Sequence, residues 1–307
     1  MATVYVGTAG WSYKDWEGIV YPAKKPKGFS PLNYLADYLD AVEVNSTFYR
    51  PPSAKLAEGW VRQTRHREDF RFTLKLHQRF THERKEPWTP TDVDTFKQGI
   101  DPLAEAGRLG GVLLQFPWSF RDVPANRDWL SRLAGEFSDY PLFVEVRHGS
   151  WGRPEGYEFF GSLGLGFCNI DQPILGTSIK PSAVLTGEQG YVRLHGRNYQ
   201  TWFAKARPGQ SDEERRNERY NYLYSEGELE EWVGHIHELM SQTDTVYVFT
   251  NNHYRGQAPA NALQLQAKLS GHAVPVPPTM FEEFPVLRDI AVQASSGQSP
   301  RKQGRLF

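Results

Sequence analysis

The sequence predicts a single (β/α)8 barrel of the TIM type, an α/β fold. Short β-branched runs alternate with amphipathic stretches along 307 residues. We count eight such runs, the number of strands that closes this barrel, and a chain of this length is ordinary for it. A doubly wound open sheet is the alternative, but no glycine-rich dinucleotide fingerprint follows the first predicted strand. The barrel is therefore the favoured fold.

The predicted strands share a short apolar run bounded by polar or glycine residues. They are Val4–Gly7, Ala41–Asn45, Phe70–Leu76, Gly111–Phe116, Leu142–Arg147, Gly166–Asp171, Tyr191–His195 and Thr245–Asn251. Because helical segments separate most of these runs, the sheet is expected to be parallel.

The predicted helices have capping residues or an apolar stripe. Ser30 precedes Pro31 as an N-cap before a proline in the first turn, and Ser53 caps the next helix. Later helices are predicted at Asp92–Ala106, Asn126–Phe137, Tyr157–Leu163 and Pro259–Leu269.

Two connections depart from a regular barrel. Residues 172–189 contain proline, glycine, serine and threonine without a convincing helix, so the barrel is expected to be irregular between its sixth and seventh strands. The connection at 196–244 is long and contains a charged segment, Asp212–Arg219, and a capping box, Ser225-x-x-Glu228. Long rim loops of this kind often carry function. We expect residues 1–292 to form the barrel domain and 293–307 a disordered tail.

Composition narrows the classes of function. The formal net charge of −1 argues against nonspecific DNA binding by the whole surface. The single cysteine, Cys168, excludes a disulfide framework or a cysteine-based zinc site within one chain. No stretch approaches a membrane span, so we expect a cytoplasmic protein without a membrane partner.

Polar side chains share one parity on seven predicted strands. Glu43 and Asn45 alternate with Val42 and Val44, and the apolar parity should pack on the helices. The inward set is then Glu43, Asn45, Thr73, Lys75, Gln115, Glu145, Arg147, Asn169, Asp171, Arg193, His195 and Asn251. Barrel enzymes keep their sites at the carboxyl ends of the strands. The alternative is a buried, mutually neutralised ion network, which is costly to desolvate.

Charged and imidazole groups of this set are the predicted catalytic residues. They are Glu43, Lys75, Glu145, Arg147, Asp171, Arg193 and His195. Glu43 or Glu145 would act as general base, and the cations would stabilise a developing anion.

A divalent metal is an open alternative at this rim. His82, His148, His195 and His253 fall on or just after strand ends, near the carboxylates. No close metal-binding spacing is present, so we assign no metal ligand. The competing interpretation makes these histidines hydrogen-bond donors, acid–base groups or surface residues.

Two loops have the features of a phosphate site. His195-Gly196-Arg197-Asn198 follows the seventh strand, and Asn251-Asn252-His253-Tyr254-Arg255-Gly256 leads from the eighth into a helix. Arg197 and Arg255 would bind the phosphate, although ordinary glycine turns explain the same sequence. The full predicted substrate-binding set is Trp11, Tyr13, Asn45, Tyr49, His82, Gln115, Arg197, Asn251, Asn252 and Arg255.

Several strings together resemble one known family. They are Gly-Thr-Ala-Gly-Trp-Ser-Tyr (7–13), Val-Glu-Val-Asn-Ser-Thr-Phe-Tyr (42–49), Phe-Thr-Leu-Lys (72–75), Thr81-His82, Leu-Leu-Gln-Phe-Pro (113–117), Val-Glu-Val-Arg-His-Gly-Ser-Trp (144–151), Val-Arg-Leu-His-Gly (192–196) and Asn251-Asn252. The set is similar to the YecE-like family, known as domain of unknown function 72. The resemblance covers about residues 3–270 and implies a TIM-barrel-type fold. It implies no established activity.

The last five residues resemble a different kind of motif. Gln303-Gly304-Arg305-Leu306-Phe307 is similar to the short peptides by which bacterial proteins bind the replication sliding clamp. Leu306 and Phe307 would fill an apolar pocket and Gln303 would hydrogen-bond at a second subsite. The alternative is a tail that packs on the barrel.

These observations together predict an enzyme acting on a phosphate-bearing substrate. The first hypothesis is a metal-assisted phosphodiester hydrolase associated with DNA. The second is a sugar or sugar-phosphate isomerase or hydrolase. The third is a non-catalytic protein that binds a ligand or nucleic acid.

Overall fold

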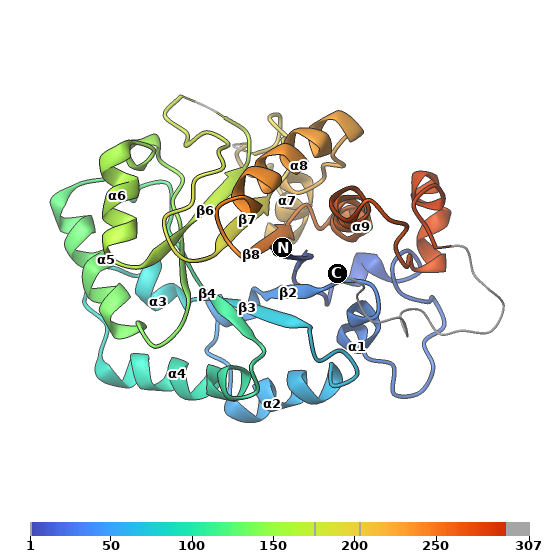
Figure 1. The fold of residues 1–307 in the computed structure, drawn as a ribbon, viewed down its shortest axis with the longest axis horizontal. Helices are drawn as coiled ribbons and strands as arrows, with labels where there is room; N and C mark the ends of the chain where they lie inside the picture. The colour runs from blue at the N-terminus through green and yellow to red at the C-terminus, as the bar shows by residue number, and fades with distance from the viewer. Residues whose placement is uncertain (1, 175, 203, 293–307) are drawn as a thin grey trace.

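Parallel strands close into a barrel in the computed structural model, which describes residues 2–174, 176–202 and 204–292 (Figure 1). The strands are β1 Thr3–Ala9, β2 Ala41–Val44, β3 Arg71–Lys75, β4 Leu109–Gln115, β5 Leu142–Glu145, β6 Leu165–Asp171, β7 Gly190–Leu194 and β8 Thr245–Thr250. Each strand pairs with its sequence neighbour, and β1 also pairs in parallel with β8 through the register Thr3 to Thr245. The predicted eight-stranded parallel barrel is confirmed.

Helices lie around the outside of the strands (Figure 1). They are α1 Pro31–Ala36, α2 Ala54–Gln63, α3 Gln78–Thr81, α4 Pro90–Glu105, α5 Pro124–Glu136, α6 Pro154–Ser162, α7 Asp212–Arg219, α8 Glu226–Met240 and α9 Gln257–Ser270. Shorter 3-10 helices are η1 Lys14–Trp16, η2 Ser46–Phe48, η3 Gly149–Trp151, η4 Tyr254–Gly256, η5 Pro278–Phe281 and η6 Pro285–Arg288.

The predicted caps form as the sequence indicated. The side chains of Ser30 and Ser53 accept hydrogen bonds from the backbone N–H groups of Asn33 and Leu56. Ser225 and Glu228 form the reciprocal capping box that begins α8. Local sequence therefore fixes where these helices start.

The outer layer differs between β6 and β8. Among the described residues of 172–189 there is no helix, and the segment forms turns and one bridge, from Ser178 to His148. The connection from β7 to β8 contains α7, which has no buried residue, and α8, which packs on the barrel. Gln303, Leu306 and Phe307 of the predicted clamp-binding tail lie outside the described residues. Over the described part of the chain, no helix is both long and apolar enough to span a membrane.

Aromatic rings fill the barrel below its carboxyl-terminal mouth. The Phe143 ring centroid lies 4.4 Å from that of Tyr191 and 6.1 Å from that of Tyr247. Gly111 and Gly166 make room for this cluster, because a Cβ atom at either would lie 2.5 or 2.6 Å from the Phe143 ring. The interior is thus closed below the mouth, and any site must lie above this aromatic layer.

Candidate functional site

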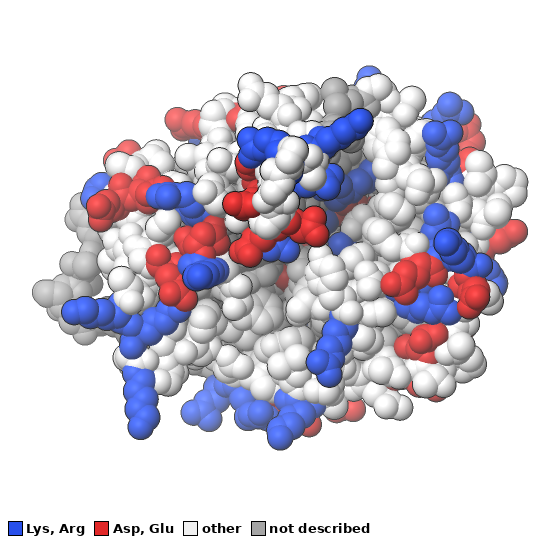
Figure 2. Space-filling view, turned by 180° about the vertical axis from the view of Figure 1, so that it is seen from behind, with Lys and Arg blue, Asp and Glu red and all other residues white. Residues whose placement is uncertain are grey.

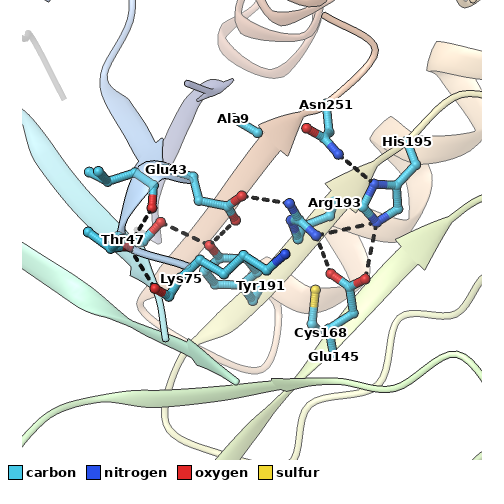
Figure 3. A network of polar contacts seen from close by, with 12 residues as sticks. Ala9, Glu43, Thr47, Lys75, Glu145, Cys168, Tyr191, Arg193, His195 and Asn251 are labelled. Carbon is cyan, nitrogen blue, oxygen red and sulfur yellow. Dashed lines mark hydrogen bonds and ion pairs between the residues drawn. The ribbon is translucent and has the colours of Figure 1, made fainter. Parts of the chain in front are cut away.

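Arg193 lies at the centre of a buried ion network across the barrel. Its Nη2 donates to Glu43 Oε1 at 2.6 Å, and its Nη1 donates to Glu145 Oε2. Figure 3 shows Arg193 between these carboxylates, which β2 and β5 bring from opposite sides. Burial alone would lower the pKa of Arg193, but Glu145 and Glu43 hold it well above its usual value. The guanidinium is therefore permanently charged and neutralised by two carboxylates.

Glu145 is held as an ionised carboxylate. Arg147 donates to its Oε1 from Nη2 at 2.9 Å, and His195 Nε2 lies 3.4 Å from the same oxygen. Burial would raise the pKa of Glu145, but Arg193, His195 and Arg147 together hold it well below its usual range. An ionised carboxylate with so low a pKa is a poor general base at neutral pH.

His195 is a neutral, fully buried histidine. Burial lowers its pKa to about 3, despite the neighbouring Glu145. The Asn251 amide lies 2.9 Å from its Nδ1 and can donate there, which assigns the ring hydrogen to Nε2, facing Glu145. His195 therefore positions Glu145 and Asn251 without carrying charge.

Glu43 has both oxygens occupied. Tyr191 Oη donates to Oε2 at 2.8 Å, and Tyr191 Oη also lies 2.9 Å from Thr73 Oγ1. Sequence analysis missed Tyr191, although it shares the parity of Arg193 and His195 on β7. Its position two residues before Arg193 is the signal that indicates an inward-facing side chain.

A cavity of about 400 Å³ opens above this network. Four cationic side chains line it, and they are Lys75, Arg147, Arg193 and Arg216. The remaining lining residues are Gly10, Trp11, Ser12, Tyr13, Asn45, Ser46, Tyr49, Gln115, Tyr220, Asn251 and His253. No carboxylate of the described residues is among those that line the cavity, so the electrostatic potential there favours an anion.

The wall of the cavity is aromatic on one side. The Tyr13 ring stacks on His253 with centroids 4.5 Å apart, and Tyr220 lies 5.1 Å from the same imidazole. Tyr13 Oη donates to the carbonyl oxygen of Ala9 at 2.6 Å, which fixes the ring. These faces and the amides of Asn45, Gln115 and Asn251 give the cavity both stacking surfaces and hydrogen-bonding groups.

Arg216 and Tyr220 reach the cavity from the long β7–β8 connection. The charged segment was noted in the sequence, but Arg216 and Tyr220 were not predicted as site residues. The residues of α7 are all charged or polar, and none is buried, so no apolar stripe indicates which of them faces the barrel. The position of α7 over the cavity depends on tertiary packing, which the local sequence pattern does not indicate.

The predicted orientation of β6 is wrong. Cys168 lies beside Glu145 in the interior (Figure 3). Because side chains alternate along a strand, Asn169 and Asp171 point outward. Asn169 Oδ1 accepts hydrogen bonds from Ser182 Oγ at 2.8 Å and Val184 N at 2.9 Å. The chain that covers this face is irregular rather than an apolar helix. Its backbone groups need hydrogen-bond partners, so polar side chains of β6 face outward to bond them. Asp171 therefore does not line the cavity.

The predicted phosphate site of Arg197 and Arg255 does not form. Arg197 Nε donates to Asp171 Oδ2 at 2.8 Å, and its other nitrogens reach Glu228 and Glu231 on α8. Arg255 pairs with Glu283 at 3.0 Å on the exposed surface. Both arginines have carboxylate partners outside the cavity, so the two glycine loops do not place them on a common ligand.

Asn252 and His82 also lie outside the cavity lining. Asn252 Nδ2 donates to the Tyr222 carbonyl at 2.7 Å and to Asn261 Oδ1 at 2.8 Å, so it holds the connection against α9. The His82 ring packs on Phe48, with centroids 4.8 Å apart. His148 caps η3 through Ser150 N and contacts Thr177. Asn252, His82 and His148 therefore each contact structural partners outside the cavity lining.

The carboxylates and histidines do not fit a divalent metal. Glu43 and Glu145 are bound to Arg193, and within the residues described no three His, Cys, Asp or Glu side chains group closely enough to hold an ion. Metal ligands need free lone pairs on a shared centre, whereas here a guanidinium occupies that centre.

Comparison with known proteins gives a consistent result. A family model described as "Protein of unknown function DUF72" matches residues 5–282. UPF0759 protein YunF from Bacillus subtilis (strain 168) is 32% identical over 272 residues, which are 85% of this chain and 93% of that protein. A DUF72 family protein of known structure from Thermotoga maritima is 37% identical with a TM-score of 0.74, covering 87% of this chain and 99% of that one. Another from Enterococcus faecalis is 25% identical with a TM-score of 0.74, covering 87% and 96%.

Proposed function

The chain belongs to the DUF72 family of proteins of unknown function, and we propose that its barrel is an enzyme for a small phosphate-bearing substrate. The observation that carries the proposal is the set of four cationic side chains, Lys75, Arg147, Arg193 and Arg216, that line one cavity and outnumber the two carboxylates, Glu43 and Glu145, buried beneath it. Arginine fits a phosphate group because its planar guanidinium donates two parallel hydrogen bonds.

The size and lining of the cavity support a small substrate. A volume of about 400 Å³ is in the range of pockets for metabolite-sized molecules. Trp11 and Tyr13 offer flat apolar faces, and Gln115 and Asn251 offer amides for hydroxyl groups. A sugar phosphate or a molecule of similar size has both kinds of group.

A nucleic-acid substrate has less support. On the face shown in Figure 2, basic and acidic side chains stand intermixed, without a broad basic track. Tight binding of a long polyanion draws on many phosphate contacts along such a track. The phosphodiester hydrolase considered from the sequence also needed a metal, for which the described carboxylates are not arranged. We therefore propose that the substrate is a small molecule rather than DNA. We also propose that the reaction has no metal-dependent step.

We expect inorganic phosphate and ribose 5-phosphate to bind in the cavity, and Arg147→Met or Arg216→Met to weaken that binding at least tenfold. Loss of one charge-assisted contact to phosphate costs on the order of 1.4 kcal/mol or more, a factor of ten in affinity. Isothermal titration calorimetry at low salt measures both affinities. Ribose without phosphate should bind far more weakly than ribose 5-phosphate.

Arg255→Met is the matched control, because Arg255 pairs with Glu283 away from the cavity. It should leave the affinity for ribose 5-phosphate unchanged. If neither phosphate nor ribose 5-phosphate binds, or if Arg255→Met weakens binding as much as Arg147→Met, the proposed function is wrong.

We also propose that the tail docks on a bacterial sliding clamp, on the sequence of Gln303, Leu306 and Phe307 alone. A peptide of residues 298–307 should bind the purified clamp in fluorescence anisotropy, and Phe307→Ala should abolish the signal. Leu306 and Phe307 would supply most of the apolar contact. No binding at high-micromolar peptide would rule this docking out without affecting the cavity.

A further inference from the structure

We infer that Lys75 is a nucleophile that forms a Schiff base with a carbonyl group of the substrate, an aldehyde or ketone that also carries phosphate. The inference rests on the proposed function and makes it more specific. It names the reacting atom, Lys75 Nζ, and the chemical class of the substrate.

The Lys75 amine is free and faces the cavity. Lys75 ends β3 on the interior side, and its side chain lines the cavity. Among the described residues its Nζ makes no hydrogen bond or ion pair, and it lies over the Phe48 ring, 3.9 Å from the centroid. Lys25, Lys97 and Lys268 instead pair with carboxylates at 2.7 to 3.2 Å.

The surrounding charges explain why Lys75 has no acidic partner. Glu43 and Glu145 are the nearby carboxylates, and Arg193 bridges them. Figure 3 shows the Lys75 side chain crossing toward Arg193 with no interaction drawn at its nitrogen. Lys75 therefore lies beside cations, and both nearby carboxylates are paired with Arg193.

This environment makes the amine reactive at neutral pH. Burial, together with the nearby Arg193 and Arg147, lowers the pKa of Lys75 to about 7 against the opposing effects of Glu145 and Glu43. About half of the amine is then neutral at pH 7, whereas an ordinary lysine is almost fully protonated. Only the neutral amine has the lone pair that attacks a carbonyl carbon, and desolvation beside other cations is a known way to supply it.

The step balances without an added oxidant or reductant. The Nζ lone pair attacks the carbonyl carbon, and the carbonyl π electrons move onto oxygen to give a carbinolamine. The two amine hydrogens then leave with that oxygen as water, and a carbon–nitrogen double bond remains. Arg147, which also bonds Glu145, and Arg216 line the same cavity and would bind the phosphate.

Borohydride trapping tests this inference directly. The full-length protein is incubated at pH 7 with dihydroxyacetone phosphate, glyceraldehyde 3-phosphate or pyridoxal 5′-phosphate, and is then treated with sodium borohydride. Hydride reduces a Schiff base to a stable secondary amine, which peptide mass spectrometry locates. We expect at least one of the three probes to label Lys75 at least tenfold more than Lys25 or Lys97.

Three controls sharpen the result. If dihydroxyacetone phosphate labels Lys75, dihydroxyacetone, which lacks phosphate, should label it at least tenfold less, and inorganic phosphate should protect Lys75 from every probe that labels it. Lys75→Met should lose the adduct while keeping the melting temperature of a folded barrel, and Lys97→Met, on the surface, should keep the adduct. The rate of labelling should rise through pH 7 and level off above it.

The outcomes separate the two proposals. If phosphate compounds bind in an Arg147-dependent way but no probe labels Lys75 above the surface lysines, the Schiff base is wrong and the proposed function stands. If Lys75 is labelled equally with and without phosphate on the probe, the phosphate-bearing substrate is wrong and the nucleophile stands. If there is neither Arg147-dependent binding nor selective labelling, both fail.

Discussion

Replacing Arg193 with methionine is expected to lower the free energy of unfolding by about 3–5 kcal/mol, because it leaves two buried carboxylates without their cation. Arg193 is the shared partner of Glu43 and Glu145, and the side chains of both acids are fully buried. Methionine keeps the unbranched apolar stem of the side chain, so the loss mainly reports the missing guanidinium. Equilibrium unfolding in urea, followed by tryptophan fluorescence, gives the value.

A triple variant provides the control. Combining Arg193→Met with Glu43→Gln and Glu145→Gln removes all three charges and should recover more than half of the lost stability. A network that merely fills space would show the opposite order, with the triple variant the least stable. A loss below about 1 kcal/mol for Arg193→Met alone would show that the ion network is not what holds the mouth together.

Acidification is the second condition with a large expected effect, because two histidines are buried in the neutral form. Burial lowers the pKa of both His195 and His253 to about 3, from an ordinary value of 6.5. Between about pH 6.5 and pH 3, the unfolded chain therefore binds two protons that the folded chain does not bind. The stability that these two histidines contribute is fully present above pH 6.5 and is lost as the pH falls toward 3, at about 2.7 kcal/mol per pH unit at most for the pair.

Urea unfolding at pH 7, 6, 5 and 4 measures this slope. His253→Gln should reduce it by about 1.4 kcal/mol per pH unit, the effect of one proton. His272→Gln, at an exposed position, should leave it unchanged. Equal slopes in all three proteins would mean that the buried imidazoles are protonated in the folded state.

The alternation of side chains along the strands predicted most of the residues at the mouth of the barrel. It was wrong at β6, where no apolar helix covers the outer face that the polar residues take. Glu43, Lys75 and Arg193 face inward because apolar helices cover the opposite faces of their strands. At β6 the outer cover is irregular chain, so Asn169 faces outward to bond Val184. Because residues 172–189 have no helical pattern in the sequence, an apolar outer face is not expected for the strand that they cover.

The cavity wall was harder to predict than its floor. Arg197 and Arg255 follow strand ends in glycine loops, which is where barrels bind phosphate, yet both pair with nearby carboxylates. Arg216 reaches the cavity from a helix with no buried residue. Which arginine of a long loop stays free depends on acids brought close by the fold, and sequence spacing does not contain that information.

The most direct test of the central claim is a crystal structure of the protein with dihydroxyacetone phosphate at a concentration near its measured dissociation constant. We predict density for the phosphate group against the Arg147 and Arg216 side chains, with the carbonyl carbon facing Lys75 Nζ or joined to it. Density for the ligand only on the outer surface, with the cavity above Arg193 filled by water alone, would contradict it.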